Sequence, residues 1–234
     1  MPTGVVTGAS RGLGLALSQA LAGRGWHLII DARDAGALQR AAGDVGREDH
    51  VTAIPGDVSD SRHRNDLATA AERAGGVDLL VNNASTLGLS PLPGLAAFPP
   101  EDLERVFRVN TVAPLALAQV LLTHLENTGG TIVNITSDAG VEAYEGWGGY
   151  GSSKAALDQI SAVLAVEHPA LHIYAFDPGD MRTKMHQDAY PSEDISDRPE
   201  PEAVVPSLLR LIDELPPSGR YRVSDLQALE RSTS

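Results

Sequence analysis

Short apolar runs bounded by glycine, proline or aspartate alternate along the chain with longer stretches of helical periodicity. This alternation is typical of βαβ units around a parallel sheet that is covered on both faces. The apolar runs predict strands near residues 3–7, 27–32, 51–55, 78–82, 130–136, 171–177 and 220–223. The stretches between them predict helices near residues 12–23, 35–46, 60–74, 100–126, 151–167 and 202–214. The pattern therefore predicts an α/β fold, a doubly wound parallel sheet with helices on both faces.

The segment 181–201 departs from this rhythm, because it is rich in Asp, Glu, Pro and Ser and includes Glu193, Asp194 and Asp197. It is too long for an ordinary connection in such a fold, and we interpret it as a candidate substrate lid. No internal repeat or linker divides the chain. With 234 residues and 42% hydrophobic content, it can bury a large core, and we expect one domain over residues 1–234.

Composition narrows the function. The 18 basic and 31 acidic residues give a net charge of −13, so the chain has no overall attraction for nucleic acid or an anionic membrane. It contains no cysteine, and His168 and His186 have no second ligand at metal spacing, so we expect no metal site. No apolar run approaches the ~20 residues of a membrane span and no signal-peptide pattern is present, which predicts a cytoplasmic protein.

A glycine-rich turn follows the first predicted strand and opens the first predicted helix. Its sequence runs Thr-Gly-Ala-Ser-Arg-Gly-Leu-Gly over residues 7–14. Glycines here can bring the backbone close to a pyrophosphate while the helix N-terminus presents amide groups to it. The alternative is a tight turn that merely requires glycine. The candidate cofactor-binding residues of this turn are Gly8, Ser10, Arg11, Gly12, Leu13 and Gly14.

Tyr150 and Lys154 stand four residues apart, which places a phenol and an ammonium group on one face of a helix. A lysine held nearby in a partly dry site lowers the pKa of a tyrosine from its usual value of about 10. Such a tyrosine could pass protons near neutral pH. Isolated pairs of this kind also occur on solvated helices, so the surrounding motifs must decide between the two interpretations.

Those motifs carry a resemblance. TGxxxGxG is followed by Asn82-Asn83-Ala84 after the fourth strand, Ser137 after the fifth, Tyr150-x-x-x-Lys154, and Pro178-Gly179 after the sixth, with Asn110 upstream of Ser137. In this order and at these intervals the chain resembles the short-chain dehydrogenase/reductase family over nearly its whole length. The resemblance implies a single-domain Rossmann fold that binds a nicotinamide dinucleotide across the carboxyl ends of the strands.

The resemblance also implies roles at the chemical end. Tyr150 would donate a proton to the substrate carbonyl oxygen as hydride arrives, and Ser137 would hydrogen-bond the same oxygen. Lys154 would lower the pKa of the tyrosine and hold the nicotinamide ribose. Asn110 would lie in a local helix distortion and connect to Lys154 through a water. The alternatives are a strand-end turn role for Ser137 and a buried, backbone-bonded Asn110 without a catalytic part.

Further cofactor contacts follow from the same resemblance. Asp57 and Val58 match the pair that contacts the adenine, although Gly56-Asp57 could equally form a turn. Thr183 would secure the nicotinamide carboxamide, and it could also cap the following helix. The remaining residues that match the family's cofactor-binding positions are Asn83, Ala84, Pro178 and Gly179.

Charge near the adenosine ribose decides between the two coenzymes. A 2′-phosphate suits a guanidinium group, whereas a free 2′-hydroxyl suits a carboxylate. Arg11 and Arg33 favour NADP(H). Asp31 stands at the spacing of a ribose-binding acid, so NAD(H) stays open, and the other interpretation of Asp31 is an ordinary strand-end residue.

The chain departs from the family at Ser85, where Asn-Asn-Ala-Gly commonly ends in glycine. Serine disfavours positive φ, so the turn beside the nicotinamide is expected to differ or to gain a hydroxyl. The loop 138–149 must pass the pocket. Its Glu142 and Glu145 either bind substrate or face water, and Trp147 either lines the pocket or packs the loop down. The acidic segment 181–201 argues against a strongly anionic substrate such as a coenzyme A thioester.

The predicted function is an NADP(H)-dependent oxidoreductase that interconverts a small ketone or aldehyde with an alcohol. The alternatives are a non-catalytic dinucleotide sensor or scaffold and, less in keeping with TGxxxGxG, a redox-neutral epimerase or dehydratase. Relatives commonly form homodimers or homotetramers through helices equivalent to those near 100–126 and 151–167. The apolar stripe of the second helix could equally be buried against its own sheet.

Overall fold

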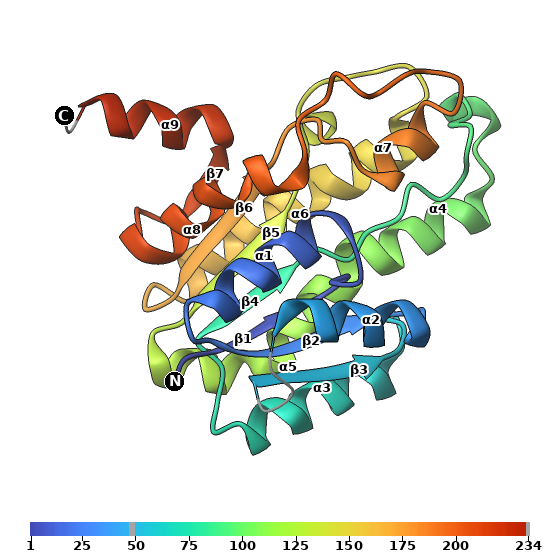
Figure 1. Ribbon diagram of the computed structural model, residues 1–234. Helices are drawn as coiled ribbons and strands as arrows, with labels where there is room; N and C mark the ends of the chain where they lie inside the picture. The colour runs from blue at the N-terminus through green and yellow to red at the C-terminus, as the bar shows by residue number, and fades with distance from the viewer. Residues whose placement is uncertain (47–49, 233–234) are drawn as a thin grey trace.

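A computed structural model of the chain describes residues 1–46 and 50–232 (Figure 1). Its seven parallel strands form one sheet in the order β3-β2-β1-β4-β5-β6-β7. The order reverses between β1 and β4, which makes the sheet doubly wound and confirms the predicted fold class. The strands are β1 (Thr3–Val6), β2 (His27–Ala32), β3 (Val51–Pro55), β4 (Leu79–Asn82), β5 (Thr131–Ile135), β6 (His172–Asp177) and β7 (Gly219–Arg222).

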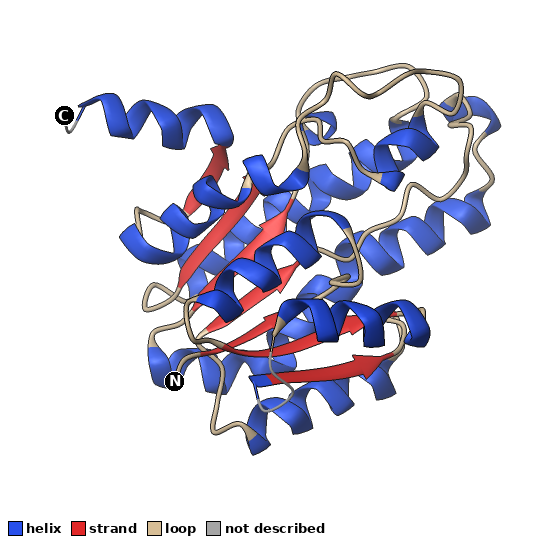
Figure 2. Cartoon of the chain, viewed as in Figure 1, coloured by secondary structure: helices blue, strands red, loops and turns tan. Residues whose placement is uncertain are grey.

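Helices cover both faces of the sheet (Figure 2). They are α1 (Gly12–Gly23), α2 (Ala35–Val45), α3 (Ser61–Arg73), α4 (Pro100–Phe107), α5 (Ala113–Thr128), α6 (Gly148–Glu167), α7 (Lys184–Ala189), α8 (Val205–Glu214) and α9 (Val223–Ser232). Short 3-10 turns lie at Leu95–Ala97, Asp138–Gly140 and Pro201–Ala203. The helix predicted near 100–126 is interrupted by a π-helix, Arg108–Val112. The helix α9 was not predicted, and α7 was anticipated only as the stretch that Thr183 could cap.

Two apolar cores lie on the two faces, because successive side chains of a strand point in opposite directions. Val6 and Ile30 pack under α1, α2 and α8, whereas Val5 and Ile29 pack under α3 and α5. All four side chains are at most 1% exposed. Burial on both faces explains why these strands appear in the sequence as continuous apolar runs rather than alternating ones.

The helical run Pro100–Thr128 is long and apolar enough for a membrane span by length and composition. The expectation that no apolar stretch approaches this length was therefore wrong for this run. In the fold, its residues Leu117, Leu121 and Leu125 are at most 1% exposed and pack in the core beneath the sheet. Burial against the sheet accounts for the apolar character of the run.

The candidate lid, 181–201, forms a compact loop that contains α7. Its ends meet where the Arg182 amide donates to the Pro199 carbonyl at 2.8 Å. Ile195 is 7% exposed and Ala189 is buried beside Tyr150 of α6. The segment therefore packs onto the part of the molecule that carries the predicted chemistry.

Candidate active site

Tyr150 and Lys154 lie in the first two turns of α6 and are 7% and 2% exposed. The Lys154 Nζ atom lies 5.4 Å from the centroid of the Tyr150 ring and donates to the Ile135 carbonyl at 2.7 Å. Burial lowers the pKa of Lys154 to about 8. The pair is thus held together at the carboxyl end of β5, as the helical spacing predicted.

The phenol of Tyr150 does not have the lowered pKa that was expected from the sequence. Burial raises its pKa, a hydrogen bond with Ser85 lowers it, and the charges of Asp177 and Asp138 raise it further. The effect of burial on the pKa dominates. The ammonium of Lys154 lies over the face of the ring and is bonded to the end of β5, so it does not offset that effect. The phenol is therefore strongly held in its protonated, proton-donating form.

Ser137 follows β5 and begins the short turn Asp138–Gly140. Its hydroxyl donates to Asp138 Oδ1 at 2.9 Å and accepts from the Ala139 amide at 3.2 Å, so the turn role considered for it is present. Ala139 packs against Tyr150, which brings this turn to the phenol. Arg220 of β7 donates to the Ser137 carbonyl at 3.0 Å, a contact that the sequence analysis missed.

Asn110 is 0% exposed and lies within the π-helix Arg108–Val112, so the helix distortion expected from the resemblance is present. Its Oδ1 atom accepts from the Ser85 hydroxyl at 3.1 Å and the Thr86 amide at 2.9 Å. Its Nδ2 group donates to the Thr86 carbonyl at 2.9 Å and the Ser153 hydroxyl at 3.0 Å. These four bonds use the full capacity of the amide, so Asn110 anchors the β4–α4 connection to α6.

Ser85 takes a backbone conformation without positive φ, so the departure from glycine does not strain the turn. Its hydroxyl donates to Asn110 Oδ1 and also interacts with the Tyr150 phenol. Ser85 therefore adds a hydroxyl between the phenol and the buried asparagine, which was one of the two expected outcomes.

The glycine turn of residues 7–14 is tightly constrained by its neighbours. Gly8 has φ +67°, and a Cβ there would lie 2.9 Å from the Ala84 Cα. Asn83 Nδ2 donates to the carbonyls of Thr7 and Gly8 at 2.9 and 3.2 Å, and the Asn83 and Ala84 amides both donate to Thr7 Oγ1 at 3.0 Å. Asn83 and Ala84 thus hold the turn in place.

This turn fits the pyrophosphate of a dinucleotide. Arg11 precedes α1, and its side chain makes no capping hydrogen bond to the first amides of the helix. The amides that begin at Gly12 and Leu13 are therefore presented to an anion in the manner of a dinucleotide site. Ser10 is partly exposed in the same turn, and the Arg11 side chain is exposed beside it.

Asp31 does not occupy the ribose position that its spacing suggested. It is 1% exposed, and its Oδ1 accepts from the Gly8 amide at 2.7 Å while its Oδ2 contacts His63 Nε2 at 2.9 Å. Burial raises the pKa of Asp31, and the hydrogen bonds from His63 and Gly8 act in the opposite direction. Asp31 therefore supports the glycine turn from beneath. His63, which comes from α3, was not identified from the sequence.

Arg33 and Asp57 lie at adjacent strand ends, since the Gly56 amide bonds to the Ala32 carbonyl at 3.0 Å. Burial raises the pKa of Asp57, but hydrogen bonds from Ser59 and the charge of Arg33 outweigh it and the pKa is lowered. Asp57 Oδ1 accepts from the Ser59 amide at 2.8 Å, so the turn considered for this position is present. Val58 is buried and Arg33 is exposed.

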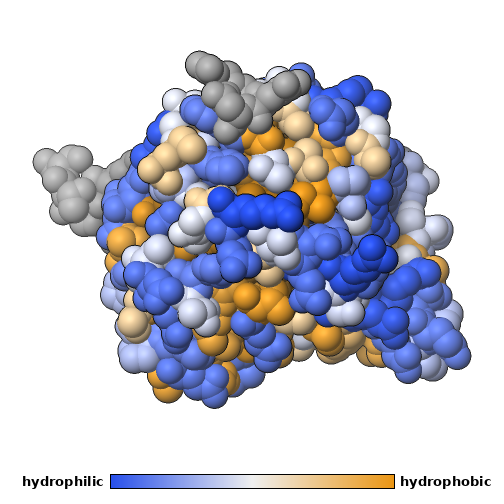
Figure 3. Space-filling view, turned by 90° about the horizontal axis from the view of Figure 1, so that it is seen from below, coloured by the Kyte–Doolittle hydropathy of each residue, from blue (hydrophilic) through white to orange (hydrophobic). Residues whose placement is uncertain are grey.

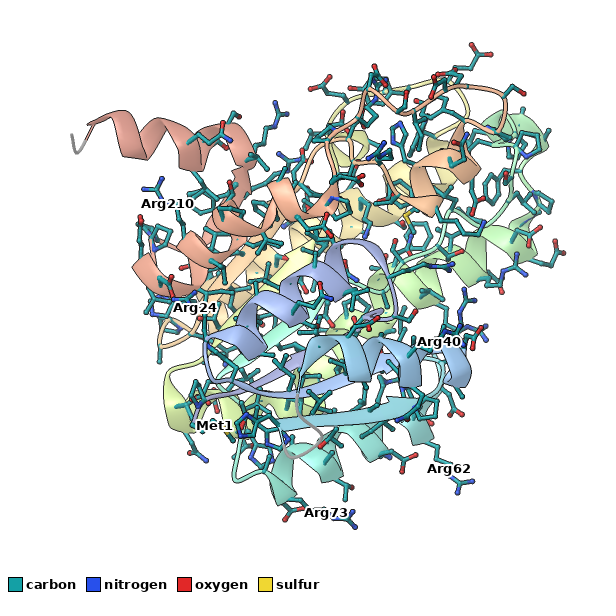
Figure 4. All side chains as sticks on the ribbon, in the orientation of Figure 1. Met1, Arg24, Arg40, Arg62, Arg73 and Arg210 are labelled. Carbon is teal, nitrogen blue, oxygen red and sulfur yellow. The ribbon has the colours of Figure 1, made fainter. Side chains whose placement is uncertain are left out.

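Other arginines also lie on this half of the molecule, and one of them, Arg64, donates to the Val58 carbonyl at 2.6 Å. Arg40, Arg62 and Arg73 point outward from α2 and α3 at the periphery of the molecule (Figure 4). Arg33 differs because it directly follows β2, at the same edge of the sheet as the glycine turn. Its position suits a group bound next to that turn.

The segment after β6 reaches the same turn. Gly179 has φ +69° beside Pro178, and its amide donates to Asp177 Oδ1 at 3.0 Å. Thr183 caps α7, accepting from the His186 amide at 3.2 Å, and its methyl group lies 3.6 Å from where a Cβ on Gly12 would stand. Thr183 thus has the structural role considered for it and also lies beside the glycine turn.

Comparisons with known proteins agree with this arrangement. A family described as short chain dehydrogenase matches residues 3–194. The sepiapterin reductase of Bos taurus is 31% identical over 197 residues, which cover 78% of this chain and 74% of that protein. The galactitol 2-dehydrogenase of Agrobacterium fabrum is 33% identical over 182 residues, covering 75% of this chain and 68% of that protein.

Solved structures show the same fold. A short chain dehydrogenase from Shigella flexneri, complexed with NADP, superposes with a TM-score of 0.87 at 26% identity, covering 95% of this chain and 97% of that one. An alcohol dehydrogenase from Thermococcus sibiricus, complexed with 5-hydroxy-NADP, gives a TM-score of 0.83 at 27% identity over 95% of both chains.

Proposed function

The chain belongs to the short-chain dehydrogenase family, and on that premise we propose that it is an NADP(H)-dependent oxidoreductase that interconverts a ketone or aldehyde with an alcohol. One observation carries the proposal. The Tyr150–Lys154 pair is buried at the carboxyl end of β5, next to the turn that begins with Ser137 and on the same edge of the sheet as the glycine turn. A proton donor and a dinucleotide cradle therefore meet at one edge.

In this proposal the chain's own residues handle the oxygen of the substrate. The phenol of Tyr150 donates its proton to the developing alkoxide, and in oxidation the phenolate takes that proton back. Ser137 turns its hydroxyl from Asp138 to the same oxygen, where a fixed donor stabilises the developing charge. Lys154 keeps a positive charge next to Tyr150 below its pKa of about 8. The nicotinamide coenzyme, when bound, supplies or accepts the hydride.

Two observations support NADP(H) as the preferred coenzyme. Arg33 is exposed at the end of β2, and Arg11 is exposed at the start of α1, so both guanidinium groups are available to a 2′-phosphate. Asp31, the residue that favoured NAD(H), has both oxygens engaged by Gly8 and His63. A carboxylate that is already satisfied and buried offers little to a ribose hydroxyl.

Transfer of an isotopic label tests the reaction. We expect the protein, with NADPH carrying deuterium at both positions of its nicotinamide C4, to reduce members of a ketone and aldehyde panel, giving alcohols with one transferred deuterium at the carbinol carbon by mass spectrometry. The same panel with labelled NADH should react more slowly. Coenzyme bound by the protein without label reaching any product of a broad panel would instead support a dinucleotide sensor.

We also propose that the protein is a homodimer or homotetramer. A groove of about 450 Å³ between α5 and α6 is lined by apolar residues that include Leu115, Ile160 and Val163. Val163 and Val166 of α6 are 42% and 81% exposed. Figure 3, in which the molecule is seen from below, shows hydrophobic residues that reach the surface in patches. Light scattering should give a multiple of the 24.6 kDa chain mass, and a monomer would refute the assembly.

A further inference from the structure

Tyr150 belongs to a cluster of apolar side chains that come from three separate connections. Leu87 and Leu92 come from the β4–α4 connection, Trp147 precedes α6, and the others belong to the segment around α7. We call this set the apolar wall. Its members are Leu87, Leu92, Trp147, Met185, Ala189 and Tyr190.

Part of the wall consists of aromatic rings. The rings of Trp147 and Tyr150 meet edge to face, with centroids 5.6 Å apart and an interplanar angle of 74°. Trp147 and Tyr190 are tilted at 46° with centroids 5.9 Å apart, and His186 lies 5.1 Å from Tyr190. These separations are typical of favourable aromatic pairs. A continuous aromatic layer thus runs from the end of α7 to the proton donor.

The wall also covers the proton donor, because Tyr150 is only 7% exposed. A substrate whose carbonyl reaches the phenol must therefore take the place of some of these side-chain contacts. A polar substrate would leave the displaced apolar side chains exposed to water, or its own polar groups would be buried without hydrogen-bond partners, and both cost free energy. A substrate with a flat or apolar ring replaces the side-chain contacts that it displaces with contacts of its own.

Charge around the phenol disfavours an anionic substrate. Asp138 and Asp177 lie near enough to Tyr150 to act on its phenol electrostatically. The ammonium of Lys154, which lies 5.4 Å from the centroid of the Tyr150 ring, is bonded to the Ile135 carbonyl. Each oxygen of Asp138 accepts a hydrogen bond without Ser137, Oδ1 from the Ala139 amide and Oδ2 from the Tyr144 hydroxyl, so they do not offer a free carboxylate to a cationic substrate either. The environment of the phenol suits an uncharged molecule.

We propose that the substrates are uncharged carbonyl compounds with an aromatic or other apolar ring next to the carbonyl, and that Trp147 and Tyr190 determine this preference by packing against the ring. The proposal rests on the oxidoreductase function proposed above. It selects one of the two interpretations of Trp147, that of a pocket wall. It also gives α7 a function, since the helix carries Met185 and Ala189 and leads directly into Tyr190.

Three related compounds test the preference. Methyl benzoylformate has a ring and no charge, benzoylformate differs only by its carboxylate, and methyl pyruvate replaces the ring with a methyl group. The intrinsic reactivity of each carbonyl is measured by its rate of reduction with borohydride, and kcat/KM with NADPH is divided by that rate. The corrected kcat/KM for methyl benzoylformate should exceed that for methyl pyruvate by about tenfold and that for benzoylformate by about a hundredfold. Equal values, or a preference for benzoylformate, would overturn the proposed substrate class.

Variants assign the preference to the wall. Trp147→Ala should bring the ratio of kcat/KM between methyl benzoylformate and methyl pyruvate towards one, and Trp147→Phe should retain most of the ratio. Glu145→Gln, an exposed change in the same loop, is the control and should leave the ratio unaltered. A ratio unchanged in Trp147→Ala would overturn the role of Trp147.

Binding measured by calorimetry to the protein with NADPH separates this proposal from the function on which it rests. If methyl benzoylformate binds more tightly than the other two compounds but none of them is reduced, the reaction is refuted and the ring preference stands. If other carbonyl compounds are reduced but methyl benzoylformate neither binds nor reacts, the ring preference is refuted and the reaction stands.

Discussion

The coenzyme end of the site and the substrate end are held together by different forces. At the coenzyme end, Asp31 and Asn83 bond directly to the backbone of the glycine turn, and His63 holds Asp31. At the substrate end, apolar side chains from three connections pack on Tyr150. Directional bonds between fixed groups specify one geometry, whereas apolar contacts are non-directional and adapt to a new partner. We infer that the coenzyme end holds one ligand in a fixed position, whereas the substrate end accommodates substrates of different shapes.

Replacing Arg33 is expected to give the largest contrast between the two ends. Arg33→Ala should weaken NADPH binding by about 10-fold to 100-fold, because a charge-assisted bond to a phosphate is lost, while NADH binding changes little. Fluorescence titration of both coenzymes measures the effect. Arg73→Ala, which removes an outward-pointing guanidinium from the last turn of α3, is the matched control. Equal weakening of both coenzymes would show that Arg33 does not read the 2′-phosphate.

Asp31→Ala tests whether the coenzyme end depends on its buried carboxylate. The change leaves the Gly8 amide and His63 without their partner, so the free energy of unfolding should fall by about 2 kcal/mol and the affinity for both coenzymes should fall together. Urea denaturation and titration measure the two effects. Asp31→Asn keeps an acceptor for the Gly8 amide and should lose less. A selective loss of NADH affinity would show instead that Asp31 binds the adenosine ribose.

Ser85→Ala is expected to give a smaller effect at the chemical end. The Ser85 hydrogen bond lowers the pKa of Tyr150, so removing it raises that pKa. Reduction needs the phenol and oxidation needs the phenolate. In plots of kcat against pH for the two directions, the part of each curve that reports the ionisation of Tyr150 should therefore move to higher pH. At neutral pH, oxidation should slow by no more than about tenfold, the value of one hydrogen bond.

Asn110 should stay in place in this variant, because its Oδ1 keeps the Thr86 amide as a donor. Ser85→Thr retains the hydroxyl and should preserve the profile. A profile that moves to lower pH, or that does not move in Ser85→Ala, would show that Ser85 does not act on the phenol.

The sequence predicted the strands well, because runs buried on both faces, such as those containing Val5 and Ile29, are apolar throughout and end at glycine, proline or aspartate. It did not predict α9, which follows β7 directly, and it anticipated α7 only as the stretch that Thr183 could cap, because the 6 residues of α7 are too few to show helical periodicity. The π-helix also breaks a helical pattern that looks continuous, since its cause is the bonding of Asn110 to a distant turn.

Motif spacing predicted the candidate site residues but did not determine which way their side chains are directed. Asp31 has the spacing of a ribose ligand, yet its direction is determined by His63, which lies 32 residues away in the sequence. The pKa of Tyr150 could not be predicted from its spacing to Lys154 because it depends on burial by the loops. Residues that act through local geometry were predictable, whereas those that depend on long-range packing required the structure.

The most direct test of the account is the Tyr150→Phe variant, measured for turnover and for NADPH binding together. Phenylalanine keeps the ring that packs against Trp147 and Lys154 and removes only the phenolic oxygen. We expect carbonyl reduction to fall by at least about a thousandfold, with the Kd for NADPH changed by less than about threefold. Tyr221→Phe, the same change outside the site, should keep full activity. Reduction that continues at a comparable rate in Tyr150→Phe would contradict the assignment of Tyr150 as the proton donor.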